Sequence, residues 1–365
     1  MRILSRYVFR EFLTPLFYCL AGFLSIYVLF ELFGSFARIV DSDLSIGDIV
    51  LYFCGYLAPF FHYLAPAALM LATLYTMWMF CRHSEIIAMR ASGVSFFAIV
   101  KPILLIAFMM ALFVTWVAEC FVPTYSPWAA QLKSDRFDLS KIVKADNIVY
   151  RNAVGNRTWN IDALLKKDGT SLKNVKVTVD RPGGERERTI IAERADYLDG
   201  EWFFSGVKVQ HYDLLGQEVA TLTPELDALS LRSYPDFSEE PADFIAQNRP
   251  WKYNSTLDRL RYLETHPELD KKNRDECLYD TLEKIMAPFA CLIITLFAIP
   301  AGIASGRQSV FRGIVGALAL FFSYYGVTIL AMVLAKTGYC PPFIAAIFPA
   351  ALFLTLGIIA FRKQR

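Results

Sequence analysis

The chain has 365 residues, of which 55% are hydrophobic and 15% aromatic, while only 20% are charged. This composition and a positive mean hydropathy are typical of a polytopic membrane protein. The formal net charge of +2 gives no indication of a nucleic-acid partner, and seven scattered cysteines predict neither a disulfide framework nor a zinc site.

The first 15 residues, MRILSRYVFREFLTP, alternate arginines with apolar residues, which suits an amphipathic helix on an anionic leaflet. The apolar run that follows is too long for a signal peptide, so we interpret it as a retained membrane span. Further runs without charge occur before and after a polar middle segment, and each is long enough to cross a bilayer. The sequence therefore predicts six transmembrane helices, within 12–36, 49–80, 96–118, 285–306, 313–335 and 337–361.

Lysine and arginine in the short loops predict the orientation of these spans. With six spans, most of these residues fall on one side, and only Arg38 and Lys336 occupy the opposite short loops. We expect both termini to be cytoplasmic and the long middle segment to be periplasmic. The cytoplasmic set comprises Arg2, Arg6, Arg10, Arg82, Arg90, Lys101, Arg307, Arg312, Arg362, Lys363 and Arg365.

A charged stretch, CRHSEIIAMRASGVS at 81–95, separates the second and third spans. Ser84 suits a helix N-cap, Glu85 then falls in the first turn, and Gly93 can end the helix in a left-handed conformation. Two interpretations remain open at this point. The stretch is either a solvated turn whose arginines only fix topology, or a surface helix that another protein binds.

The middle segment contains short runs of alternating apolar and polar residues separated by Gly, Asp, Asn or Pro, for example around Val175 and Val177. These runs predict an inserted antiparallel β domain, a sandwich or jelly roll, between helices 3 and 4. A capping-box-like start at 255–258 predicts a helix after the strands. The predicted division is an N-terminal membrane half, the periplasmic domain with its helical connector, and a C-terminal membrane half, at 1–121, 122–280 and 281–365.

We find no pattern in the sequence that indicates catalysis or a cofactor. The phosphate-binding loop Gly-x-x-x-x-Gly-Lys-Ser/Thr does not occur, and the four histidines show no metal-ligand spacing. His62, inside a span, is either a proton-relay or ligand site or a polar residue bonded within the helix bundle. Glu31 and Glu119 either line a polar cavity or reach the membrane interface. We therefore predict no catalytic residues, no metal and no cofactor.

Several stretches together resemble the lipopolysaccharide export permeases of the LptF/LptG family. The resemblance covers nearly the whole chain, including the layout of three spans, a β domain and three spans. No single motif decides it, but their order and spacing are specific. The stretches are RYVFREFL, RHSEIIAMRASGVS, MAPFACLIITLFAIPAGIASGR and TGYCPPFIAAIFPAALFL.

The resemblance implies a permease subunit of an ATP-driven exporter in the bacterial inner membrane. Its implied partners are a paralogous six-span permease, a cytoplasmic ATPase dimer, a bitopic periplasmic β-domain protein that receives the lipid, and lipopolysaccharide itself. It also implies that 82–92 is a helix that couples to the ATPase, with Glu85 entering the ATPase. The coupling candidates are Arg82, Ser84, Glu85, Met89 and Arg90.

An exporter of an anionic lipid should place cations near the outer ends of its spans. Arg38 and Lys336 are the short-loop candidates there, with Glu31 nearby, although both cations could instead be snorkelling interface residues. Two functions from other classes also remain open, a membrane-embedded lipid-modifying enzyme and a non-transporting scaffold with a periplasmic β domain.

Overall fold

The computed structural model divides into two compact units. The membrane unit comprises Met1–Lys133 and Lys271–Arg365, and the β unit, Ser134–Asp270, is inserted between them in sequence. The structure describes residues 2–42, 44–134, 137, 146–165, 169–213, 217–219, 232–234, 236–247, 249–267, 269–306 and 310–362.

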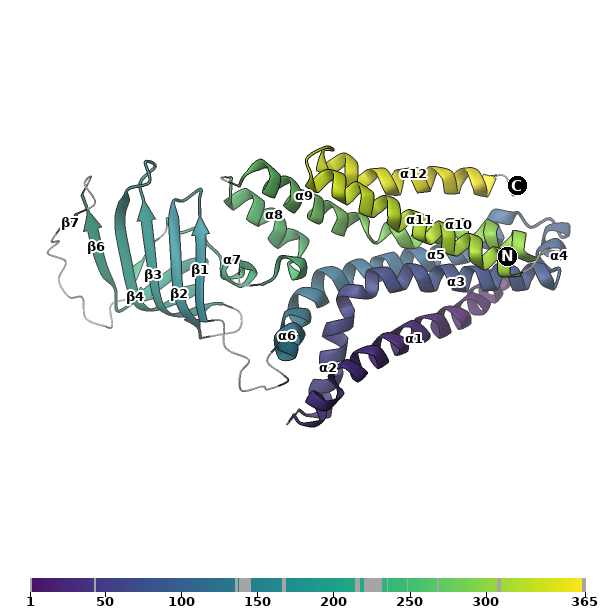
Figure 1. Cartoon of the computed structure of the whole chain (residues 1–365), viewed down its shortest axis with the longest axis horizontal. Helices are drawn as coiled ribbons and strands as arrows, with labels where there is room; N and C mark the ends of the chain where they lie inside the picture. Colours follow the sequence, from purple (N-terminus) through teal and green to yellow (C-terminus); the bar gives the residue numbers. More distant parts are fainter. Residues whose placement is uncertain are drawn as a thin grey trace. The chain divides into compact units, whose positions relative to one another are not determined.

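The membrane unit is helical throughout its described elements (Figure 1). Its first part contains α1 (Arg2–Val40), α2 (Ile46–Leu57), the 3₁₀ turn η1 (Ala58–Phe60), α3 (Phe61–Arg82), α4 (Glu85–Ala91), α5 (Phe96–Trp116), the π-helical turn η2 (Val117–Phe121) and α6 (Val122–Ser134). Its second part contains α9 (Lys271–Met286), α10 (Phe289–Gly306), α11 (Val310–Lys336) and α12 (Pro342–Arg362).

Five helical segments among the described residues are long and apolar enough to cross a membrane, which confirms that the chain is built of membrane helices. They are Ile3–Val40, Ile46–Arg82, Phe96–Ser134, Val315–Lys336 and Pro342–Arg362. The predicted fourth span, 285–306, covers α10 and the last residues of α9; these two helices bend by 51° at a short break and give a sixth span if counted together. Pro288 lies in this break, where its missing amide hydrogen favours interruption of the helix.

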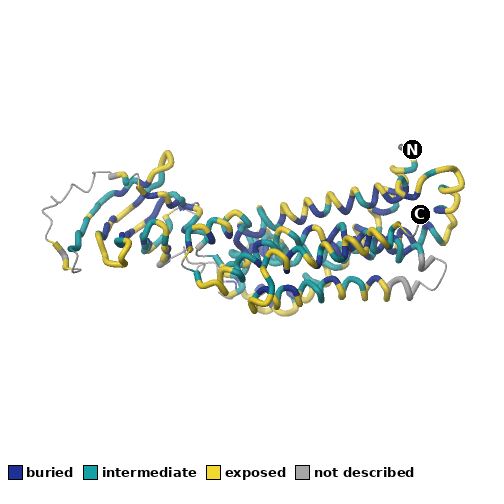
Figure 2. Tube along the Cα trace, turned by 90° about the horizontal axis from the view of Figure 1, so that it is seen from above, coloured by how far each residue is buried: buried dark blue, intermediate teal, exposed yellow. Residues whose placement is uncertain are grey.

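The core of the membrane unit joins helices from both parts of the sequence. Phe80 of α3, Ile99 of α5 and Ile299 of α10 belong to one buried cluster, and further buried residues join α3 to α10, α11 and α12. At Gly302 of α10, helices α10 and α3 approach so closely that a Cβ added to the glycine would lie 2.7 Å from the Cβ of Met77 on α3. Buried and exposed residues alternate along the helices, so that most helices present an exposed apolar side (Figure 2). Such continuous apolar surface is what a bilayer covers.

The β unit confirms the predicted antiparallel strands (Figure 1). The described strands are β1 (Asp146–Asn152), β2 (Arg157–Leu164), β3 (Ser171–Asp180), β4 (Arg186–Leu198), β5 (Glu201–Ser205), β6 (Lys208–Tyr212), β7 (Glu218–Val219) and β8 (Arg232–Ser233). A further alternating run in the sequence, QEVATL at 217–222, lies outside the described residues beyond Val219.

These strands form one sheet in the order β1-β2-β3-β4-β5-β8, with β6 and β7 attached beside the main path. A sandwich would have two separate sheets. Here β4 has 13 residues and pairs with β5 along its C-terminal part and with β6 along its N-terminal part, which keeps the described strands in one network.

Alternation along the strands directs large side chains to one side of the sheet. Trp159 and Trp202 are fully buried together with Phe204 and Phe244, the last of which comes from α7 (Pro241–Gln247). After the turn η4 (Trp251–Tyr253), helix α8 (Thr256–Thr265) begins at the predicted capping box, because Ser255 accepts the Asp258 amide hydrogen at 3.1 Å. The middle segment therefore folds on an ordinary hydrophobic core.

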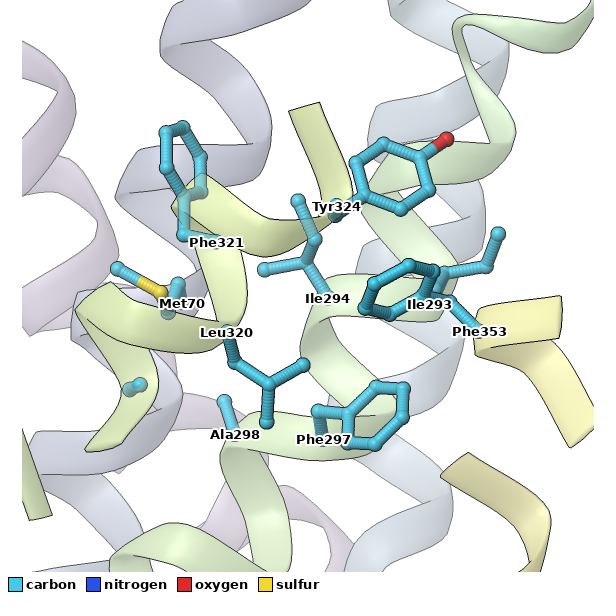
Figure 3. A pocket seen from close by; sticks show the side chains of 10 residues that line it. Met70, Ile293, Ile294, Phe297, Ala298, Leu320, Phe321, Tyr324 and Phe353 are labelled. Carbon is cyan, nitrogen blue, oxygen red and sulfur yellow. The ribbon is translucent and has the colours of Figure 1, made fainter. Parts of the chain in front are cut away.

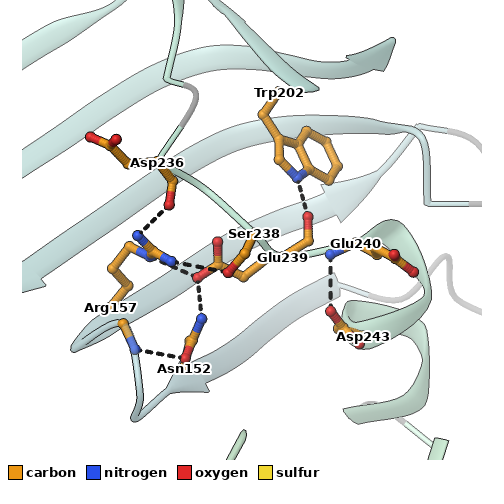
Figure 4. A network of polar contacts seen from close by, with 9 residues as sticks. Asn152, Arg157, Trp202, Asp236, Ser238, Glu239, Glu240 and Asp243 are labelled. Carbon is orange, nitrogen blue, oxygen red and sulfur yellow. Dashed lines mark hydrogen bonds and ion pairs between the residues drawn. The ribbon is translucent and has the colours of Figure 1, made fainter. Parts of the chain in front are cut away.

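A buried polar cluster holds the chain after β8 against the sheet (Figure 4). The Glu239 carboxylate accepts hydrogen bonds at 2.8 Å from Arg157 Nε and from Asn152 Nδ2. The Glu239 carbonyl accepts a third, at 2.7 Å, from the indole of Trp202. Because the Arg157–Glu239 pair is nearly inaccessible to water, losing either charge leaves the other buried without its partner.

We expect Glu239→Ala to destabilise the β unit by about 3 kcal/mol or more, because Arg157 and Asn152 lose their shared acceptor. Glu240→Ala is the matched control. Glu240 pairs with Arg261 in a contact that is partly exposed to solvent, so this substitution should cost about 1 kcal/mol or less. Amide hydrogen exchange of β2 and β5 in the full-length protein in detergent measures both effects. Equal effects of the two variants would contradict the assigned role of Glu239.

Candidate functional site

The charged stretch between the second and third spans folds as the short helix α4. It lies at the end of the membrane unit where α1 begins and α12 ends (Figure 1). Helix α3 continues to Arg82, and α4 starts only at Glu85, after a turn. The surface helix is therefore shorter than the predicted 82–92, and Arg82 belongs to the preceding span.

Ser84 occupies the N-cap position of α4 but makes no capping hydrogen bond from its side chain. An N-cap serine needs extended backbone angles to reach the amides of the first turn. Ser84 instead has φ 59° and ψ 16°, because it forms the left-handed turn between α3 and α4. The prediction of a capping role for Ser84 is wrong in this respect. Gly93, with φ 85°, adopts the left-handed conformation that was expected after the helix.

One side of α4 is anchored in the core. Ile86 is 6% exposed and belongs to the same buried cluster as Val8, Phe12 and Phe80. Met89 is partly buried and packs against this cluster, so much of its side chain contacts the protein itself. The apolar anchor fixes the orientation of a helix that is too short to be stable alone.

The other side of α4 is open to solvent. Arg90 and Ala88 are exposed, and Ile87 is 59% exposed. We had not selected Ile87 from the sequence. Adjacent helical residues are about 100° apart, so the burial of Ile86, which only the tertiary structure reveals, places Ile87 away from the core.

The two charged candidates at the ends of the turn have different surroundings. The Tyr7 hydroxyl of α1 donates a hydrogen bond of 3.0 Å to Oε2 of Glu85, which is half-buried. Arg82 is exposed and its guanidinium lies 5.2 Å from the ring centre of Trp78 on α3. Glu85 is thus bonded to another helix, α1, whereas Arg82 contacts a residue of its own helix, α3.

At the opposite end of α1, the carboxylate of Glu31 is enclosed by hydrogen-bond donors. It is 5% exposed and accepts bonds from Ser35 at 2.9 Å, Tyr52 of α2 at 2.7 Å and Lys133 of α6 at 2.8 Å. Glu31 therefore joins three helices. In this arrangement its charge is directed at protein groups.

The two cations proposed for the outer side also differ. Lys336, at the end of α11, lies 3.0 Å from Glu276 Oε1 and 3.0 Å from Asp280 Oδ1, both on α9. Its positive charge is balanced by these two carboxylates. Arg38, near the end of α1, is exposed.

A small, mostly apolar cavity of about 30 Å³ lies beside the break between α9 and α10. His62, Glu283 and Tyr325 are among its lining residues, and it has room for about one or two water molecules. Glu119, the other acid considered from the sequence, pairs with Lys284 at 3.1 Å. Among the described residues, no group of three or more His, Cys, Asp or Glu side chains could hold a metal ion.

A second cavity, between α3, α10, α11 and α12, is apolar and has a volume of about 10 Å³ (Figure 3). Met70, Phe297 and Phe353 are among its lining residues. This volume barely equals one water molecule, so the cavity is a packing gap and cannot receive an acyl chain.

The whole-chain comparison decides the family. The model of the lipopolysaccharide export system permease LptF/LptG matches residues 6–363. The chain belongs to this family. It is therefore a lipopolysaccharide export permease and a multi-pass protein of the inner membrane, and its family is one of transport proteins, not of enzymes. None of the curated proteins compared with the chain matches it.

Proposed function

We propose that this LptF/LptG permease is one half of an ATP-driven exporter that extracts lipopolysaccharide from the inner membrane. A paralogous permease with six spans forms the other half, and a cytoplasmic ATPase dimer drives both. A bitopic protein with its own periplasmic β domain receives the lipid. The family match over nearly the whole chain is the observation that carries this proposal.

In this proposal α4 is the helix that couples to the ATPase. Its exposed side offers Ile87 and Arg90, with Glu85 at its start, while Ile86 holds the helix on the core. A short helix that combines an apolar contact, a cation and an acid suits a groove on a separate protein. Ser84 and Met89 support the helix, and Arg82 lies at its border.

The proposed orientation places both termini and α4 in the cytoplasm. The start of α1, the end of α12 and α4 all lie at one end of the membrane unit, which agrees with the predicted distribution of Lys and Arg (Figure 1). The inserted domain is then a periplasmic, jelly-roll-like domain within 122–280. It separates the two membrane halves, 1–121 and 281–365, which together supply six transmembrane helices.

For the lipid, we propose that Arg38 and Lys336 meet its phosphates at the outer ends of α1 and α11. Exposed Arg38 is the stronger candidate, because a guanidinium can bind phosphate through two hydrogen bonds. Lys336 contributes less while Glu276 and Asp280 balance its charge. Glu31 supports the site from behind by holding α1 to its neighbours.

We expect Glu85→Ala to weaken binding of the ATPase by about 2 kcal/mol or more. The reason is that a charged hydrogen-bond donor in the groove of the ATPase loses the Glu85 carboxylate as its acceptor. Membrane insertion and the β unit should be unchanged. Copurification with the ATPase and ATP-dependent lipid release from reconstituted vesicles measure the effect. Arg82→Ala is the control and should have less effect, since Arg82 contacts Trp78 of its own helix. Normal assembly and release by Glu85→Ala would end the coupling proposal.

The orientation predicts where reporters are active. A reporter fused after Arg365 should be active only in its cytoplasmic form. One inserted after Gly184, in the exposed turn between β3 and β4, should be active only in its periplasmic form, since this turn belongs to the inserted domain. The reverse result at either position would contradict the six-span orientation.

Photocrosslinking groups test the outer cations. A crosslinker at position 38 should capture lipopolysaccharide in an active complex, and one at 336 should capture less, because two acids surround Lys336. A crosslinker at exposed Ser92, beside α4, is the control and should capture none. No capture at 38 or 336 would show that both cations only anchor their helices at the interface.

A further inference from the structure

A hydrogen bond joins the first turns of α1 to the start of α4. The Tyr7 hydroxyl donates to Oε2 of Glu85 at 3.0 Å, across 78 residues of sequence. Tyr7 is 40% exposed and Glu85 is half-buried, so water could solvate both groups if the bond were absent. Such a bond adds little to folding stability. Its main physical effect is to fix the direction of the Glu85 side chain.

The two residues are held on one rigid support. Val8 and Phe12 of α1 are fully buried in the same cluster as Phe80 of α3 and Ile86 of α4. The ring of Tyr7 also packs 5.9 Å from the ring of Phe80. The hydroxyl therefore has a defined position relative to α4, and it constrains a side chain that would otherwise sample several rotamers.

A carboxylate has two oxygens, and this geometry uses them differently. Tyr7 occupies Oε2, and none of the described residues is recorded as a donor to Oε1. Oε1 can therefore accept a hydrogen bond from a protein that docks on α4. Fixing a glutamate before binding avoids the loss of side-chain freedom during binding, which corresponds to about a 2- to 12-fold change in Kd.

We infer that Tyr7 is a positioning residue, which holds Glu85 in the orientation that the ATPase receives. The inference rests on the proposed coupling role of α4 and extends it to the first turns of α1. It also gives the N-terminal segment a role in energy coupling in addition to its association with the membrane.

Tyr7→Phe tests the inference because it removes only the hydroxyl and keeps the ring against Phe80. We expect the full-length permease complex in nanodiscs to bind the purified ATPase about 2- to 12-fold more weakly. Tyr18→Phe is the matched control on the same helix. Tyr18 is 69% exposed, and no hydrogen bond of its hydroxyl to a described residue is recorded, so binding should be unchanged.

A double-mutant cycle separates positioning from a general effect on the fold. If Tyr7 acts through Glu85, adding Tyr7→Phe to Glu85→Ala should cause no further loss of binding. An equal loss in both backgrounds would overturn the inference, as would unchanged or tighter binding by Tyr7→Phe alone. If Glu85→Ala itself binds normally, the coupling proposal fails together with the inference. If Glu85→Ala binds weakly and Tyr7→Phe does not, only the inference fails.

Discussion

The membrane unit depends on the close packing of α3 against α10. These helices lie on opposite sides of the inserted β unit in sequence, yet a Cβ added at Gly302 of α10 would lie 2.7 Å from the Cβ of Met77 and 3.0 Å from the carbonyl oxygen of Leu74, both on α3. A glycine permits this approach because no side chain separates the two backbones. In the most apolar stretch of the second span, which includes α3, 61% of the residues are buried. In the corresponding stretch of the first span, α1, only 11% are buried. The remaining helices therefore surround α3 and present their apolar sides to the bilayer.

This packing also explains how a very short helix keeps a fixed orientation, which the docking role proposed for α4 would need. Helix α4 follows directly from the central helix α3, and Ile86 joins the core that α3 and α1 build. The orientation of α4 is thus set by the tertiary core and needs no long run of helical hydrogen bonds. Ile86 shares this core with residues of α1, α3 and α5, so α4 is held by three helices at once.

Several charged residues near the ends of the spans form ion pairs. Glu31 bonds Lys133, Glu119 bonds Lys284, and Lys336 lies between two acids of α9. Each pair links helices that are distant in sequence, and pairing reduces the cost of charge near hydrocarbon. This arrangement leaves Arg38 as the exposed cation among the three lipid candidates.

The sequence by itself determined the membrane helices, because runs free of charge are a local property, and the strands, because alternation of apolar and polar residues is local too. It also determined the capping box at Ser255 and the left-handed Gly93. Only the tertiary structure decided which side of α4 is buried, that Ser84 is a turn residue, and that Glu31 faces Lys133, 102 residues away. The physical reason is that these contacts join segments whose proximity arises from helix packing, which no local pattern of residues encodes.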